Sequence, residues 1–237
     1  MTRPWQILDY GAGLGQQQMD YDRQLLDRHS QNLDFPCTLR FYSWQPAAIS
    51  LGFHQKQYPD HWNAIAKQYQ LEIVRRPSGG RAVLHYGDLT YAVITEVNGR
   101  SHRQVYEAIC EFLIKGFARL GVELSYGKAG RGYIHNPSCF STATNADLVI
   151  GDGRKLIGSA QVYRHNSVLQ HGSIAIAPNY DLLRALFTDD IPIVGYQEIA
   201  PVLNLDQSFD QKFDQSVSQI IEQLTQSARQ YLLTELL

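Results

Sequence analysis

The segment Arg75–His85 combines the residue types from which anion-binding loops are built. It reads Arg-Arg-Pro-Ser-Gly-Gly-Arg-Ala-Val-Leu-His. Two adjacent glycines allow the backbone to adopt positive φ or to come close to a ligand. The flanking arginines give such a loop affinity for a carboxylate, a phosphate or a phosphopantetheine arm. Taken alone, the pattern fits either a ligand-binding loop or an arginine-flanked hairpin turn whose charges are solvated.

Lys155 is a second candidate for chemistry because it opens a strand that carries small and polar residues. A strand is expected over Arg154–Tyr163, after the turn Gly151-Asp152-Gly153. Side chains alternate along a strand, so Lys155 is expected to share a face with Ile157, Ser159 and Gln161. This polar strip indicates either a functional surface or the solvated face of an antiparallel sheet.

A histidine and a cysteine complete the set of candidate reactive groups. His171 lies in Gln170-His171-Gly172-Ser173, where a glycine interrupts an apolar strand, as it does at bulges and at ligand contacts. Cys139 lies among small polar residues, where nearby cations can lower the pKa of a thiol and activate it as a nucleophile. A structural histidine and an inert, partly buried thiol are the alternative interpretations.

Composition excludes several classes of function. The 237 residues are 44% hydrophobic and 19% charged, as in ordinary globular proteins, and the net charge of −2 gives no general case for nucleic acid or an anionic membrane. No apolar run is long enough to span a bilayer, and Met1–Gln6 contains no signal core, so we expect a cytoplasmic protein. Three cysteines without a CxxC pair argue against a disulfide framework or a zinc site, and Cys37 and Cys110 are expected to be structural.

The elements that position these residues follow from apolar periodicity. We expect strands to cluster between helices without regular βαβ alternation, which predicts an α+β fold with mixed or antiparallel sheets covered by helices. No internal repeat or linker is visible, so residues 1–237 are expected to form a single catalytic domain. The expected helices are Gln16–His29, Pro59–Tyr69, Val105 to near Gly121, Asp181–Phe187 and Gln215–Leu236. The expected strands are Thr38–Trp44, Ala47–Phe53, Leu71–Arg75, Leu89–Val97, Ala146–Ile150, Arg154–Tyr163 and Val168–Ala177.

Several segments together resemble the lipoate-protein ligase and octanoyltransferase superfamily, which belongs with the biotin/lipoate protein ligases. The resemblance covers most of residues 40–177. In order, the segments are Ser50–Gln55, Arg75–His85, Gly87–Tyr91, Asp147–Val149, Gly153–Gln161 and Leu169–Ile174. Cys139 occupies the position of the cysteine in those octanoyltransferases that carry it shortly before the Gly-Arg-Lys segment. One departure is Tyr86, where many relatives have an aspartate.

The resemblance implies a biotin/lipoate-ligase-like fold and a ping-pong acyl transfer. Cys139 attacks the octanoyl thioester of acyl carrier protein, Lys155 stabilises the oxyanion, and a lysine of a lipoyl carrier domain then receives the octanoyl group. The carrier domain is that of the glycine cleavage H protein or of the acyltransferase subunit of 2-oxoacid dehydrogenases. The residues implied to bind substrate are Arg75, Arg76, Ser78, Gly79, Gly80, His85, Gly158, Ser159, His171 and Gly172.

Three other functions remain open at this point. An ATP-dependent lipoate-protein ligase uses the same loop and lysine, but the ligases that this chain resembles commonly carry an extra C-terminal domain. An amidotransferase that moves octanoyl groups between carrier domains uses the same cysteine. A non-catalytic acyl-binding module has no need of Lys155 and Cys139 together. No metal or cofactor is expected, and ATP with magnesium enters only if the ligase alternative holds.

Overall fold

A computed structural model describes residues 3–127, 147–187, 192–200 and 209–232. Its main element is a seven-stranded mixed sheet in the order β1-β2-β6-β10-β9-β8-β7, in which only the pair β1–β2 is parallel. The strands are β1 (Trp5–Gly13), β2 (Cys37–Trp44), β6 (Asp88–Glu96), β10 (Ser167–Ala175), β9 (Lys155–Arg164), β8 (Asp147–Val149) and β7 (Ser125–Tyr126). The predicted α+β class with mixed sheets is confirmed.

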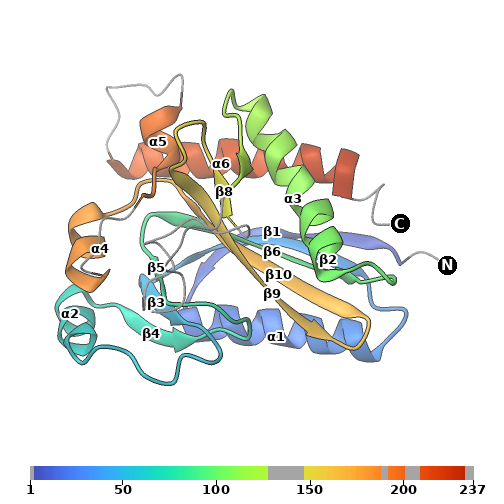
Figure 1. The fold of residues 1–237 in the computed structure, drawn as a ribbon, viewed down its shortest axis with the longest axis horizontal. Helices are drawn as coiled ribbons and strands as arrows, with labels where there is room; N and C mark the ends of the chain where they lie inside the picture. Colours follow the sequence, from blue (N-terminus) through green and yellow to red (C-terminus); the bar gives the residue numbers. More distant parts are fainter. Residues whose placement is uncertain (1–2, 128–146, 188–191, 201–208, 233–237) are drawn as a thin grey trace.

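Helices cover both faces of this sheet (Figure 1). On one face, α1 (Gly15–Gln31) packs Met19, Leu25 and Leu26 against the sheet, as its sequence periodicity predicts. On the other face lie α3 (His102–Arg119), α6 (Phe209–Ser227) and the π-helical turn η1 (Ala228–Leu232), which together with the sheet bury the largest apolar core. Buried polar side chains lie between α1 and the sheet, among them Asp22, Arg40 and His171.

A second, three-stranded sheet lies beside the first, at the left of Figure 1. Its order is β4 (Glu72–Arg75), β3 (Ala48–Leu51) and β5 (Val83–His85). The helices α2 (His61–Tyr69) and α4 (Tyr180–Phe187) share a separate apolar core with it. The glycine-rich turn therefore connects β4 to β5, within this small sheet.

The sequence misplaced or missed a few elements. The last helix begins at Phe209, six residues earlier than predicted, and its final turn is π-helical. The strands β1, β5 and β7 and the short helix α5 (Tyr196–Ile199) were not predicted. β1 was not predicted because it lies at the edge of the sheet, where its side chains are half-buried or exposed and show no regular alternation.

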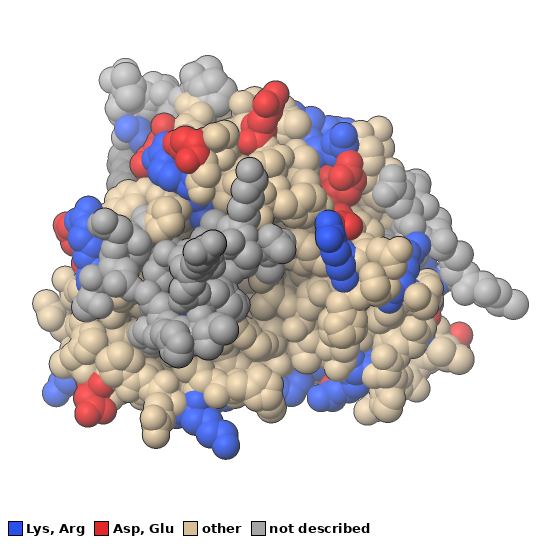
Figure 2. Space-filling model, in the orientation of Figure 1, with Lys and Arg blue, Asp and Glu red and all other residues tan. Residues whose placement is uncertain are grey.

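The described helices and the charges on one face can be compared with the composition. None of the helices in the described ranges is long and apolar enough to cross a membrane. In Figure 2, basic and acidic side chains both lie mostly around the rim of the visible face. This mixture agrees with the net charge of −2.

A buried polar cluster joins α1 to the sheet at the first residue of β10, Ser167. His29 lies 2.7 Å from the Ser167 hydroxyl through Nδ1 and 3.5 Å from the Cys37 sulfur through Nε2. Burial, assisted by the charge of Arg3, lowers the pKa of His29 from 6.5 to about 4. Cys37 opens β2 and is buried in this cluster, as expected of a structural cysteine.

The depressed pKa of His29 predicts a pH-dependent stability. Because the folded pKa lies below the unfolded value, protonation favours the unfolded chain. The contribution of His29 is therefore complete above pH 6.5 and is lost as the pH falls from 6.5 to about 4, by about 3 kcal/mol. Urea unfolding across this pH range should show a shallower loss of free energy for His29→Gln than for the wild type.

The exposed His54 supplies the control. His54→Gln should keep the wild-type dependence of unfolding free energy on pH. An equally steep loss in His29→Gln and the wild type would show that His29 does not cause it.

Candidate active site

A cavity of about 280 Å³ lies on the α1 face of the large sheet, beside the glycine-rich turn. It crosses the sheet from β8 and β9, over β10 and β6, to β2, which is about 19 Å at the usual spacing between strands. Its lining is mainly apolar around a few polar groups, as in many small-molecule sites. Met19, Tyr42, Trp44, Val83 and Ala160 are among the residues that contribute the apolar wall.

Lys155 reaches this cavity because β9 begins with an irregular register. Val149 pairs with Lys155 but Leu148 pairs with Ile157, so an extra residue lies between them. The Lys155 N–H donates to the Pro192 carbonyl. The irregularity turns Lys155 to the cavity, while Ile157 packs in the core under α3. The prediction that Lys155 shares a face with Ile157, Ser159 and Gln161 is therefore wrong.

The ammonium of Lys155 is held against a carboxylate. Its Nζ lies 2.7 Å from Oδ1 of Asp147, and both side chains are buried. Gly158 makes room for the lysine: a Cβ at this position would lie 2.5 Å from Lys155 Cε and 2.6 Å from Nζ. Two opposite charges thus occupy one end of a largely apolar cavity, where electrostatic interactions are stronger than in water.

The two adjacent arginines at the end of β4 hold different segments of backbone. Arg76 lines the cavity and donates to the carbonyls of Ser50 (2.8 Å) and Gly79 (2.8 Å). Arg75 is not among the residues that line the cavity, and its guanidinium donates to the carbonyls of Gly52 and Gln55, both at 2.7 Å. Arg76 therefore holds the backbone of the turn, whereas Arg75 holds the segment that follows β3, and of the two only Arg76 lines the cavity.

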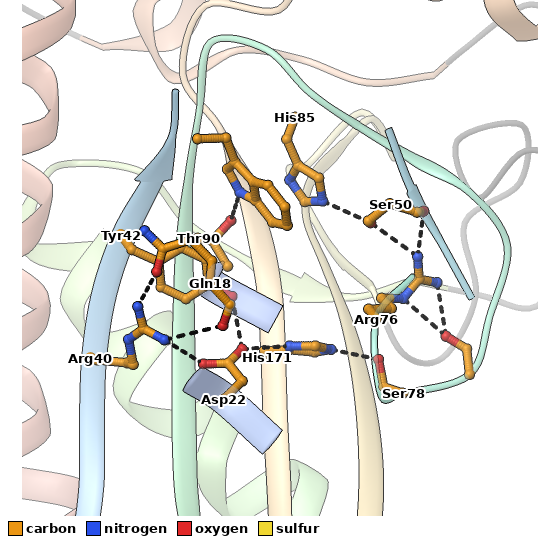
Figure 3. Close-up of polar contacts among 12 residues, drawn as sticks. Gln18, Asp22, Arg40, Tyr42, Ser50, Arg76, Ser78, His85, Thr90 and His171 are labelled. Carbon is orange, nitrogen blue, oxygen red and sulfur yellow. Dashed lines mark hydrogen bonds and ion pairs between the residues drawn. The ribbon is translucent and has the colours of Figure 1, made fainter. Parts of the chain in front are cut away.

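Two histidines of the cavity wall each lie between a carboxylate and a serine. Figure 3 shows both serines and the carboxylate beside His171, that of Asp22. His85 contacts Asp88 through Nδ1 and Ser50 through Nε2, both at 2.8 Å. Burial is the largest effect on His85 and lowers its pKa despite the opposing pull of Asp88, so the ring is neutral at pH 7. The carboxylate next to His85 thus comes from Asp88, while Tyr86 is exposed.

His171 makes the same kind of contacts with residues from different elements. Its Nδ1 lies 3.0 Å from Oδ2 of Asp22 on α1, and its Nε2 lies 2.5 Å from the hydroxyl of Ser78 in the glycine-rich turn. Asp22 also receives hydrogen bonds from Arg40 and from Tyr42, each at 2.8 Å. This network connects helix α1, the large sheet and the turn.

The structure brings most of the predicted site residues together. The cavity is lined by Arg76, Gly79, Gly80, His85, Lys155, Gly158, Ser159, His171 and Gly172. Ser78 contacts the cavity-lining His171, and Arg75 contacts the segment after β3, outside the cavity lining. Ser159 also lines the cavity, but its hydroxyl bonds to Tyr91 on the other face of the sheet. Cys139 lies outside the described residues.

The family matched by the sequence carries the description lipoyl protein ligase A/B catalytic domain, over residues 15–229. This chain belongs to that family. The octanoyltransferase LipM of Halalkalibacterium halodurans is 36% identical over 77% of this chain and 70% of the relative. That of Bacillus subtilis is 35% identical over 77% of this chain and 69% of the relative. The predicted resemblance is confirmed.

Solved structures of lipoate ligases share the fold. A lipoate-protein ligase A bound with ATP superposes with a TM-score of 0.73 at 18% identity, covering 98% of this chain and 86% of that one. A bipartite lipoate protein ligase from Thermoplasma acidophilum, studied with its E2 lipoyl domain, gives a TM-score of 0.62 at 20% identity over 98% and 84%. At such identities the likeness establishes the fold alone.

Several residues of this lipoyl-ligase-family site were not singled out from the sequence. Asp22 carried a usable signal: it lies at helical spacing between Met19 and Leu26, on the apolar face of α1, where an unpaired carboxylate is costly. Asp147 and Asp88 belong to segments that carry the family resemblance, but their partners depend on strand register. Within the described ranges, no group of three or more His, Cys, Asp or Glu residues could hold a metal ion.

The contact between Lys155 and Gly158 yields a prediction. In Gly158→Ala the new Cβ displaces the flexible lysine rather than backbone, so the ammonium leaves Asp147 while the fold survives. The catalytic rate should fall about 10²-fold, because a displacement of about 1 Å in a catalytic group has that cost. Steady-state kinetics and thermal unfolding of the same preparations measure the two effects.

Gly151→Ala is the matched control, because a Cβ there meets no atom within 4 Å. It should retain the wild-type rate. A Gly158→Ala enzyme with full activity would show that the position of Lys155 does not matter for the reaction.

Proposed function

We propose that this protein is an octanoyltransferase of lipoate biosynthesis, acting as a single catalytic domain over residues 1–237. It takes the octanoyl group from acyl carrier protein and transfers it to a lysine of a lipoyl carrier domain. The observation that carries the proposal is the apolar cavity with the buried Lys155–Asp147 pair at one end, in a chain about 35% identical to curated octanoyltransferases. Neither nucleic acid nor a membrane has a part in this function.

The proposed reaction has two steps. In the first, the Cys139 thiolate attacks the thioester carbonyl, a new carbon–sulfur bond forms, and the carrier's thiolate leaves and takes up a proton. In the second, the neutral amine of the acceptor lysine attacks the acyl-enzyme. An amide bond forms, the Cys139 thiolate is released, and the nitrogen loses a proton.

Lys155 supports both steps in the same way. Each passes through a tetrahedral intermediate whose oxygen carries a negative charge, and an ammonium in an apolar cavity is suited to stabilise it. Asp147 keeps that ammonium in place beforehand, so little reorganisation is needed when the charge develops. The apolar wall from Ala160 to Met19 and Trp44 accommodates the alkyl chain.

An ATP-dependent ligase is the second candidate, because lipoate ligases share this fold. In that reaction the carboxylate of a free acid is activated as an acyl-adenylate, which requires ATP with magnesium and no cysteine nucleophile. A carrier-to-carrier amidotransferase differs from the first proposal only in its acyl donor. The requirement for ATP, the identity of the donor and an adduct on Cys139 therefore separate the three.

The deciding experiment is incubation with octanoyl-acyl carrier protein in the absence of ATP, followed by intact-mass and peptide mass spectrometry. We expect one octanoyl adduct, on Cys139, which a lipoyl carrier domain then discharges. Cys139→Ser should form no thioester adduct, whereas Cys110→Ala, a change at a buried packing position, should still form it. No adduct on the wild type, together with ATP-dependent attachment of free lipoate, would establish the ligase instead.

Lys155→Ala tests the electrostatic role. Loss of one oxyanion donor costs about 10²–10³-fold in kcat, and we expect a decrease of this size in octanoyl transfer. Single-turnover measurements should show the decrease both in formation and in discharge of the acyl-enzyme. Transfer at the wild-type rate would exclude the proposed role of Lys155.

A further inference from the structure

Asp22 is a buried carboxylate that the proposed reaction does not use. It lies on α1 and is inaccessible to solvent. One oxygen accepts from Arg40, and the other accepts from Tyr42 and contacts Nδ1 of His171. Its negative charge is therefore matched by Arg40, and its contacts connect α1 to the two strands β2 and β10.

The hydrogen bonds that begin at Asp22 have one consistent direction. An ionised carboxylate only accepts, so His171 donates its proton from Nδ1. The Nε2 of a neutral ring then carries a lone pair, and the hydroxyl that lies 2.5 Å away, that of Ser78, donates to it. Asp22 thus selects the tautomer of His171, and the histidine in turn fixes the rotamer of Ser78.

Ser78 transmits this arrangement to the glycines of the turn. The Ser78 carbonyl accepts from the Phe53 N–H at 2.9 Å, and the Gly79 carbonyl accepts from Arg76. In a trans peptide the N–H points opposite to the carbonyl of the same unit. The N–H groups of Gly79 and Gly80 therefore point away from these partners, and within the described part of the chain neither has an acceptor.

We infer that Asp22 is a positioning residue for acyl transfer, acting through His171 and Ser78 on the glycine-rich turn. The chain Asp22–His171–Ser78 holds the turn so that the Gly79 and Gly80 N–H groups are available as donors to the oxygen of the acyl substrate. Gly79 and Gly80 line the same cavity as Lys155, which supplies the charge. This inference rests on the proposed function for its chemistry.

A second series of hydrogen-bonded side chains, Asp88–His85–Ser50, lies beside the first and helps to define the role of Asp22. It has the same order of groups and ends on Arg76, which donates to the Ser50 carbonyl and contacts its hydroxyl at 3.2 Å. The turn is thus held at Ser78 through His171 and at Arg76 through Ser50 (Figure 3). The carboxylates behind these contacts are Asp22 and Asp88. Only the first chain joins helix α1 to the turn.

A double-mutant cycle with Asp22→Asn and Ser78→Ala tests the inference. Each single change should lower kcat for octanoyl transfer about 10–10²-fold with a smaller change in KM, because the donors act on the developing oxyanion. If Asp22 acts through Ser78, the kcat of the double variant should lie within about threefold of the kcat of the slower single variant. Losses that multiply would overturn the inference.

The matched control is Ser167→Ala, which removes a buried serine–histidine hydrogen bond from the other end of β10, away from the cavity. It should lower thermal stability without lowering kcat. Equal losses of kcat in Ser167→Ala and Ser78→Ala would show that Ser78 affects activity only through the stability of the fold, which would contradict the inference.

Two measurements are independent of catalysis and separate failure of this inference from failure of the proposed function. Nitrogen-15 NMR of His171 should show a protonated Nδ1 and an unprotonated Nε2 in the wild type. Amide hydrogen exchange at Gly79 and Gly80 should quicken in Asp22→Asn and Ser78→Ala but not in Ser167→Ala. The opposite tautomer, or unchanged exchange, would refute the hydrogen-bond chain even in an active enzyme. An inactive wild type with both signatures intact would refute octanoyl transfer instead.

Discussion

The buried ion pair between Lys155 and Asp147 is the interaction on which the rest of the site depends. Removing two charges from water is costly, and the cost is offset only where the partners meet in good geometry. Three features of the fold supply that geometry. The irregular start of β9 turns the lysine to the cavity, residues 192–194 hold its backbone, and Gly158 leaves space for its side chain.

The remaining polar groups of the cavity serve mainly to hold backbone. Arg76 donates to carbonyls in and beside the glycine-rich turn, and His85 and His171 each contact a serine hydroxyl of a neighbouring segment. The same residue types that could act as anion binders or proton carriers are thus engaged in orienting one loop. Such preorganisation suits a reaction whose transition state develops charge at a single oxygen. It also explains why an apolar cavity contains so many satisfied polar groups.

Most of the site residues that were singled out from the sequence line the cavity, but the contacts between them were not predicted. Helical spacing was enough for α1 and α3, because one face of each is buried. Turn residues bounding apolar runs were enough for β9 and β10, although the burial of these strands does not alternate. Alternation failed at Lys155, since a single extra residue in a strand reverses the side to which a side chain points. Asp22 was missed because its contact with His171, 149 positions away, depends on the full fold. Asp88 was missed because its contacts with His85 and Ser173 depend on how β5, β6 and β10 meet. β1 was missed because an edge strand buries too little to impose a pattern.

The central claim is that the acyl carbonyl lies at Lys155 and the alkyl chain extends across the sheet towards Trp44. The most direct measurement is a crystal structure of the protein with a bound octanoyl thioester or as the octanoyl-enzyme. The account predicts the carbonyl oxygen within hydrogen-bond distance of Lys155 Nζ, with the chain crossing Gly158 and Ala160 beneath α1. A carbonyl placed away from Lys155, or an alkyl chain outside this cavity, would contradict it.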